Sequence, residues 1–161
     1  MTNPVYVLGG YQTDFAKSWA RSQGQTYVIP HVRETIEDVW RRAGVSCIDA
    51  MSGIETHDCF TTTEYMAIDH MGLTAPGKSW QAVEGGSIEP GGRCPVNMSG
   101  GVIGCGHPVG ASGMRMLWDA SRQVTHRAEA SQIEGAQRIQ TMNIGGSCAK
   151  VVTFVVGSGQ A

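Results

Sequence analysis

The segment NMSGGVIGCGHPVGASG, residues 97–113, decides how this chain folds. It is dense in glycine, and a pattern with helical spacing follows it directly. Glycine at this density favours tight turns and close approach of the backbone to a ligand. Gly104, Gly106 and Gly110 do not have the spacing of a dinucleotide fingerprint, and no Walker lysine follows them. The segment therefore predicts a rigid turn that ends at a helix N-terminus.

His107 lies within this turn, between Gly106 and Pro108. A histidine ordinarily titrates near neutral pH, so a rigidly held one is suited to act as a general base. It is equally compatible with an ordinary turn histidine. From the residues alone, both interpretations stay open.

A second candidate site is Glu55-Thr56-His57-Asp58-Cys59-Phe60, at a predicted junction between a strand and a helix. Such a junction presents helix N–H groups, and together with a nearby histidine these favour the thiolate form of a cysteine. The same N–H groups and His57 could stabilise an oxyanion. The other interpretation is a buried structural Cys59 beside a capping Asp58.

The third candidate is the turn that begins at Asn143 and continues through Gly145 and Gly146. By itself it predicts only a hairpin turn. The remaining histidines and three of the cysteines have no supporting neighbours, so we expect them to be surface or structural residues: His31, His70, His126, Cys47, Cys94 and Cys148. Cys105 is expected to be a small residue in a tight turn.

The order of predicted elements indicates an α/β layered domain. Residues 5–8 form a short β-type run stopped by Gly9-Gly10, and residues 74–93 are turns and loop. Helical spacing covers 32–43, 61–71 and 111–126, the last with Met114, Leu117, Ala120 and Val124 as its apolar positions. Residues 52–56 predict a buried strand, and 138–144 and 151–156 predict a hairpin.

The composition narrows the classes of function. A formal net charge of −2 provides no overall attraction to nucleic acid or to an anionic membrane. No apolar run is long enough to span a bilayer, and no signal peptide is recognisable. Five cysteines without a CxxC pair argue against a disulfide scaffold and against a zinc site. The last six residues, 156–161, are not a Ser-Lys-Leu peroxisomal signal, so we expect a reducing, cytoplasmic location.

Taken in this order, the three segments resemble the second half of thiolase-superfamily enzymes. The pattern N-x-x-G-G-x-x-x-x-G-H-P-x-G-A-[ST]-G of that family matches residues 97–113. The H-D-C-F element at residues 57–60 is similar to that of the sterol-carrier-protein-type (SCP2/SCPx-like) subgroup, where other thiolases have N-E-A-F. Asn143-Ile144-Gly145 occupies the position of the late C-x-G element of other thiolases, so the late catalytic cysteine is absent.

The resemblance implies a layered α-β-α half with a mixed five-stranded sheet. It also implies a set of site residues. His57, Cys59 and His107 would be catalytic, with Cys59 taking the acid/base role of the absent late cysteine. Asn143, Gly145 and Gly146 would support the oxyanion or the turn, and Gly106, Pro108, Gly110 and Ser112 would bind the coenzyme A or acyl substrate. No metal and no permanently bound cofactor are implied.

The resemblance is incomplete at the N-terminal side. Residues 1–30 resemble the opening strand and loop of the family, and residues 31–161 resemble its C-terminal domain. We expect the stretch that would carry the nucleophilic cysteine of the family to be missing around residues 23–31, since none of the five cysteines lies in a similar setting. We therefore expect the chain to lack most of the N-terminal half.

Three hypotheses follow for the function. The first is an acyl-CoA acyltransferase of thiolase type, such as an acetyl-CoA acetyltransferase, which cleaves or forms a 3-ketoacyl-CoA. The second is a non-catalytic, truncated chain that pairs with a full thiolase subunit, and the third is a stand-alone module that binds an acyl or coenzyme A ligand. Because one half alone would expose an apolar helix face, we expect a homo-oligomer or a complex with another thiolase-like subunit.

Overall fold

The computed structural model describes residues 6–14, 24–146 and 148–159. The strands are β1 (Tyr6–Asp14), β2 (Gly53–Thr56), β3 (Arg138–Gly145) and β4 (Lys150–Gly157). The helices are α2 (Pro30–Arg42), α3 (Thr61–Met71), α4 (Trp80–Glu84), α5 (Gly101–Cys105) and α6 (Ser112–Val124), and two 3-10 turns cover Ile48–Ala50 and Glu129–Ser131.

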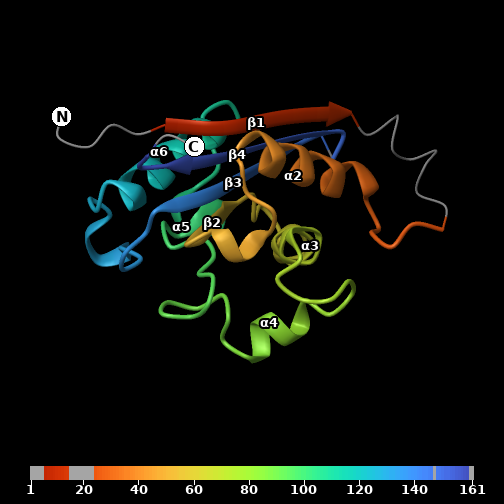
Figure 1. Cartoon of the computed structure of the whole chain (residues 1–161), viewed down its shortest axis with the longest axis horizontal. Helices are drawn as coiled ribbons and strands as arrows, with labels where there is room; N and C mark the ends of the chain where they lie inside the picture. Colours follow the sequence, from red (N-terminus) through yellow and green to blue (C-terminus); the bar gives the residue numbers. More distant parts are fainter. Residues whose placement is uncertain (1–5, 15–23, 147, 160–161) are drawn as a thin grey trace.

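The strands form one mixed sheet in the order β1-β4-β3-β2 (Figure 1). β3 and β4 make the predicted hairpin, β1 pairs with β4 in antiparallel fashion, and β2 pairs with β3 in parallel. The predicted mixed sheet is confirmed; among the described residues, a single parallel bridge between Val96 and Ile54 lies at the position of a fifth strand. Pro90 and Pro95 precede this bridge, and proline cannot donate a hydrogen bond to a strand ladder.

Helices cover both faces of the sheet, which confirms the layered α-β-α arrangement. On one face, α2 and α3 pack with alternate residues of β4, among them Val151 and Val155. On the other face, α6 packs on Val156 of β4 and Ile139 of β3 through Ala120 and Val124. Because successive side chains of a strand point to opposite faces, Val155 and Val156 belong to different apolar clusters.

The glycine pair at 9–10 does not end β1, contrary to the sequence prediction. A Cβ on Gly9 would lie 2.8 Å from Cβ of Arg42 on α2, and a Cβ on Gly10 would overlap the ring of Phe154 on β4. The glycines therefore allow the strand to pass close to α2 and β4, with a bulge between Val7 and Gly9. Residues 6–14 thus extend the sheet of the predicted C-terminal domain; the rest of the predicted strand run, Val5, lies outside the described residues.

Two further predictions are corrected in detail. Residues 74–93 are not loop throughout, since they contain α4. On α6, Met114 is exposed and Met116 takes the buried position, because the apolar face of the helix is rotated relative to the predicted spacing. The helices predicted at 32–43 and 61–71 are confirmed as α2 and α3.

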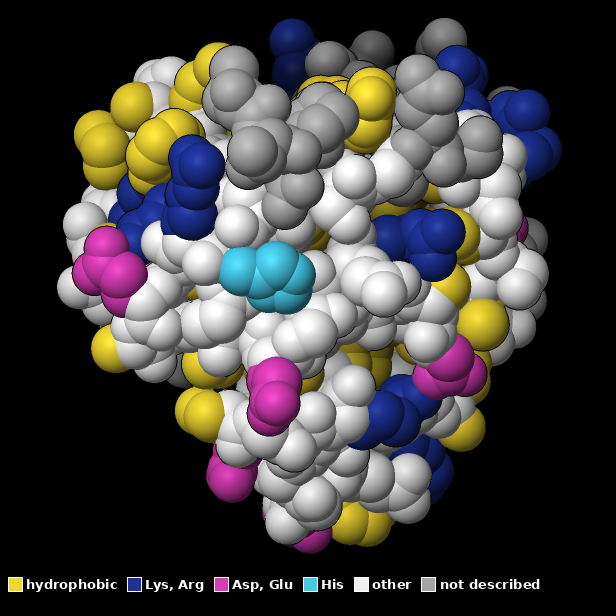
Figure 2. All heavy atoms as spheres, turned by 60° about the vertical axis from the view of Figure 1, so that its left-hand side comes forward, with side chains coloured by type: hydrophobic (Ala, Val, Ile, Leu, Met, Phe, Trp, Pro, Cys, Tyr) yellow, Lys and Arg dark blue, Asp and Glu magenta, His cyan; other side chains and the backbone are white. Residues whose placement is uncertain are grey.

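Within the described residues, no helix combines the length and the apolar character needed to cross a bilayer. On the face shown in Figure 2, basic and acidic side chains are interspersed, and hydrophobic side chains are scattered over the face with the largest group at the upper left. That face therefore carries no field of a single sign.

Candidate active site

His57 is held where β2 leaves the sheet. Its backbone N–H donates to the carbonyl of Met142 on β3 at 2.9 Å, which continues the parallel pairing by one residue. Asn97 supports the same junction from the side: its Oδ1 accepts the N–H of Thr56 at 2.7 Å, and its Nδ2 donates to Glu64 at 3.1 Å. Asn97, the first residue of the glycine segment, therefore links β2 to α3 through its side chain.

Cys59 lies directly before α3 and is partly buried. The N-cap of α3 is Phe60, and the hydroxyl of Thr63 closes the first turn by donating to the carbonyl of Phe60 at 2.6 Å. The thiol of Cys59 thus lies beside the first turn of a helix, as the sequence indicated.

His107 is oriented by α6. Its Nδ1 lies 2.7 Å from the hydroxyl of Ser112, a fully buried residue of the first turn of α6. The same hydroxyl donates to the carbonyl of Pro108 at 3.2 Å. The roles of the two groups in the first contact depend on the tautomer of His107. When Nδ1 carries the proton, the lone pair is on Nε2, the form that a general base requires.

These segments meet at one cavity of about 410 Å³. The ring centroids of His57 and His107 lie 4.8 Å apart, with an edge-on angle of 77° between the ring planes. Cys59 and Asn143 lie at the same cavity. The full lining consists of His57, Cys59, Phe60, Thr63, His107, Val109, Asn143, Ile144, Gly145, Gly146, Cys148, Lys150 and Val152. The structure therefore brings together the three segments that the sequence singled out.

Burial is the main electrostatic influence on His57. It lowers the pKa of this imidazole below the ordinary value of 6.5, and the nearby His107 lowers it further, while Asn143 and Asp58 act in the opposite direction. At neutral pH His57 is therefore an uncharged ring. Within the described part of the chain, Nδ1 of His57 and Oδ1 of Asn143 are buried and have no hydrogen-bond partner. Unpaired buried polar atoms beside a cavity are typical of a site that completes its bonds with a ligand.

The turn between β3 and β4 closes the cavity. Gly145 ends β3, and Gly146 adopts φ +55°, a conformation that favours glycine. The start of α6 also lies close to β3, since a Cβ on Gly113 would be 2.6 Å from Nδ2 of Asn143. Asn143, Gly145 and Gly146 thus lie where the resemblance implied, but their role in stabilising an oxyanion stays a prediction.

Cys148 is a cavity residue that the sequence did not single out. It adopts φ +66°, and His31 contacts its carbonyl through Nε2 at 2.8 Å. Burial raises the pKa of its thiol, and the nearby Cys59 adds to this effect. Lys150 was missed as well, although it pairs with Gly145 across the hairpin. The predicted hairpin register is the signal that could have located both residues.

The four residues expected to bind substrate lie in the turn that carries His107. Ser112 holds the histidine ring, and the carbonyl of Pro108 accepts the N–H groups of Ala111 and Ser112. Gly106 and Gly110 are exposed. None of the four is part of the cavity lining. Their direct contact with substrate stays a prediction.

His70 and Cys94 do not line this cavity. His70 is buried and fully bonded, with Nδ1 2.8 Å from the carbonyl of Met66 and Nε2 accepting the N–H of Ile29 at 3.1 Å. Burial raises the pKa of the Cys94 thiol to about 11, so this cysteine is inert at neutral pH. The described cysteines are all free, and no group of three or more His, Cys, Asp or Glu residues in that part of the chain could hold a metal ion.

Comparison with known proteins shows the family of the chain. Residues 15–158 match the family described as Thiolase C-terminal domain-like. The chain belongs to this thiolase-like family. It is 33% identical over 122 residues to Sterol carrier protein 2 of Gallus gallus, and 37% identical over 94 residues to an acetyl-CoA acetyltransferase of Methanothermobacter thermautotrophicus. These alignments cover 76% and 58% of this chain but only 22% and 24% of the relatives, so the chain spans about a quarter of their length.

Solved structures show the same fold. The chain superposes with a TM-score of 0.82 on a structure titled "Ltp2-ChsH2(DUF35) aldolase", at 19% identity and over 97% of this chain and 40% of the other. A monomeric SCP2-thiolase like protein type 1 from Mycobacterium smegmatis gives a TM-score of 0.66 at 15% identity, over 98% of this chain and 30% of the other. The predicted resemblance to SCP2-type thiolases is confirmed.

Proposed function

We propose that this chain carries the acid/base side of a thiolase-type acyl-CoA site, which acts in the formation or cleavage of a 3-ketoacyl-CoA. The observation that carries the proposal is the convergence of His57, Cys59 and His107 on one cavity. Coenzyme A or an acyl-CoA would be the substrate, without a permanently bound cofactor. The name of the acetyl-CoA acetyltransferase relative supports this class of reaction.

Each of the three residues has a role that fits its setting. Cys59 would move the proton between the α-carbon of the acyl group and the solvent, or protonate the leaving thiol. His57, uncharged and buried, would donate a hydrogen bond to the enolate oxygen, which a fixed donor stabilises better than water does. His107, held by Ser112 through Nδ1, would act through Nε2 as the base that activates a nucleophilic thiol.

The nucleophilic thiol itself would come from another segment or another chain. In support, Ile103, Val109, Met114 and Trp118 are exposed apolar side chains on α5, α6 and the turn between them, and Val109 also lines the cavity. Large apolar side chains gathered on neighbouring exposed elements are compatible with an interaction site. Two of the similar proteins are named as parts of assemblies: "Benzoylsuccinyl-CoA thiolase subunit BbsB" and the Ltp2–ChsH2(DUF35) aldolase.

The proposal can be tested without the nucleophile. When the chain is incubated with acetyl-CoA in D2O, a base removes an α-proton, the electron pair moves onto the thioester oxygen, and a deuteron returns to carbon. Mass spectrometry measures the deuterium in the acetyl methyl group. We expect Cys59→Ala to lower the exchange rate by about 100-fold or more and His57→Ala by a similar factor.

Cys47→Ala is the matched control, because Cys47 is an exposed thiol that does not line the cavity. Exchange that is unchanged in Cys59→Ala would refute the role of this thiol. Binding of acetyl-CoA without any exchange would favour the other interpretation, a chain that binds coenzyme A or an acyl ligand without catalysis.

A further inference from the structure

The short helix α5 joins the two catalytic segments and is bonded at both ends. At its first turn, the buried carboxylate of Asp58 accepts the N–H of Val102 at 2.6 Å. Gly101 adopts φ +61°, and a Cβ at this position would overlap the Asp58 carboxylate. Asp58 lies between His57 and Cys59 in the sequence. The start of α5 is therefore attached to the residue that separates the imidazole and the thiol of the first segment.

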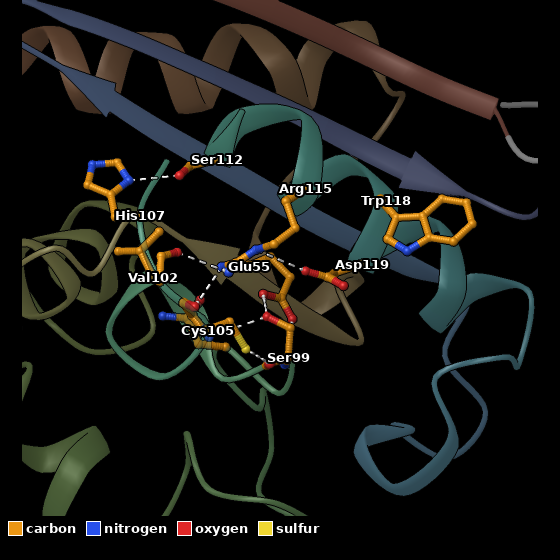
Figure 3. A network of polar contacts seen from close by, with 12 residues as sticks. Glu55, Ser99, Val102, Cys105, His107, Ser112, Arg115, Trp118 and Asp119 are labelled. Atoms are coloured by element: carbon orange, nitrogen blue, oxygen red, sulfur yellow. Dashed lines mark hydrogen bonds and ion pairs between the residues drawn. The ribbon is translucent and has the colours of Figure 1, made fainter. Parts of the chain in front are cut away.

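The other attachment comes from α6. Arg115 donates from Nη2 to the carbonyl of Gly101 at 2.6 Å and from Nη1 to the carbonyl of Gly106 at 3.2 Å. Its Nε lies 3.5 Å from the carboxylate of Asp119, four residues further along the same helix face. Figure 3 shows Arg115 reaching from α6 toward α5, with Asp119 beside it. The guanidinium of Arg115 thus binds a carbonyl at each end of α5. The second of these, the carbonyl of Gly106, belongs to the residue directly before His107.

A buried glutamate holds the segment that leads into α5. Glu55 of β2 accepts the hydroxyl of Ser99 at 2.6 Å and the N–H of Ser99 at 3.2 Å (Figure 3). Ser99 in turn accepts the N–H of Gly101 through its hydroxyl oxygen at 3.3 Å. The backbone from Ser99 to Gly106 is therefore bonded on one side to Glu55 of β2 and to Asp58, which follows β2, and on the other side to Arg115 of α6.

We propose that Asp58 and Arg115 are positioning residues that clamp α5 from both ends and so set the separation of His57 and His107. The proposal rests on the proposed function only where it treats these two histidines as active-site residues. Neither clamp residue lines the cavity, so each acts through its neighbour in the chain and not on a substrate.

The residue types suit this role. A guanidinium presents several N–H groups in a rigid fork and can bridge two carbonyls, whereas the ammonium of lysine is a point donor. Asp58 is buried, so water competes little for its bond to Val102. A displacement of about 1 Å in a catalytic group can lower a rate by about 100-fold, and bonds that prevent such a displacement matter to catalysis.

The test uses the whole chain, isotopically labelled, and reads the two histidine rings by NMR. Arg115→Ala is expected to weaken or abolish the NOE between the His57 and His107 rings. It should also raise the pKa of His57, because His107 is one of the groups that lower it. The exchange of acetyl-CoA should fall by about 100-fold. Arg122→Ala, on the same helix, is the control and should leave all three measurements unchanged.

A second pair isolates the bond at the other end of the clamp. Asp58→Asn and Asp58→Ala both remove the charge, but only alanine removes the acceptor for Val102. We expect the ring NOE to persist in Asp58→Asn and to be lost in Asp58→Ala. If Arg115→Ala does not fold, Arg115→Lys replaces it: a weakened NOE supports the clamp, and an unchanged NOE contradicts it.

The proposal is overturned if folded Arg115→Ala, confirmed by circular dichroism, retains the wild-type NOE and His57 pKa. It is also overturned if the two Asp58 variants behave alike. These ring measurements need no substrate, so a chain that fails to exchange acetyl-CoA but shows a coupled ring pair refutes the proposed function and leaves the clamp standing.

Discussion

The two helical faces of the sheet differ in how completely they are covered. On the α2 face, Val32, Ile36, Val39 and Trp40 are all buried, and the indole N–H of Trp40 donates to Gln140 at 2.8 Å. The α6 face also has a buried layer, yet its outer side leaves Met114 and Trp118 70% and 64% exposed. The α2 layer is complete within this chain. The α6 layer leaves apolar side chains exposed, and we propose that this surface contacts another chain.

The largest expected difference between the faces is in stability. Ile36→Ala should lower the free energy of unfolding by about 2–5 kcal/mol, because it leaves a cavity in a fully buried layer. Met114→Ala should change it by less than about 0.5 kcal/mol, since this side chain is exposed. Urea titration followed by circular dichroism measures both values. Equal effects would show that the α6 face is covered in solution.

The polar interior beneath α6 should make stability depend on pH. Burial raises the pKa of Glu55 to about 7 from its ordinary value of 4.5. Between these pH values the folded chain binds more protons than the unfolded chain, so stability falls as pH rises through this window, by at most about 3 kcal/mol. The Glu55→Gln variant should lack this contribution to the fall of unfolding free energy with pH.

Unfolding free energies of both proteins, measured in urea from pH 4 to pH 8, check this prediction. Asp119 also has a raised pKa through burial, and it is present in both chains. The difference between the two curves therefore isolates Glu55. Parallel curves would mean that its carboxyl group is solvated.

Substitutions of two glycines with positive φ test how tightly the chain is packed at the end of α2 and at the start of α5. Around Gly44, after α2, a Cβ would meet no atom within 4 Å, so Gly44→Ala should cost only the conformational strain, about 1 kcal/mol. Gly101→Ala adds the overlap with Asp58 and should cost about 2 kcal/mol or more. Thermal unfolding distinguishes them. Similar losses would argue against a tight contact between Gly101 and Asp58.

The smallest effect on stability is expected at the outer face of α6. Trp118→Glu should change the free energy of unfolding by less than about 0.5 kcal/mol, because the indole is exposed. It should nevertheless weaken self-association or binding to a partner chain. Sedimentation equilibrium of the wild type and the variant measures this. A wild type that stays monomeric at high concentration would contradict self-association through this surface.

Local patterns in the sequence determined most of the elements and the identity of the site segments. The bounds of α3 match the predicted helix, whose first turn is closed by the hydroxyl of Thr63 and whose end is Gly72 in the left-handed conformation. The H-D-C-F and G-H-P elements identified His57, Cys59 and His107, which lie at one cavity. These features depend on residues close together in the sequence, so a single chain reveals them.

Tertiary structure alone decided the rest. The continuation of β1 through Gly9-Gly10 depends on the close packing of α2 and Phe154 against them, which no local pattern contains. Cys148 lines the cavity because the hairpin turns it toward Cys59, and Arg115 binds Gly101 and Gly106 because α6 folds back over α5. Such contacts join residues distant in the sequence or depend on exact rotation about a helix axis. Spacing predicts which side chains share a face, and only the packed fold decides what that face meets.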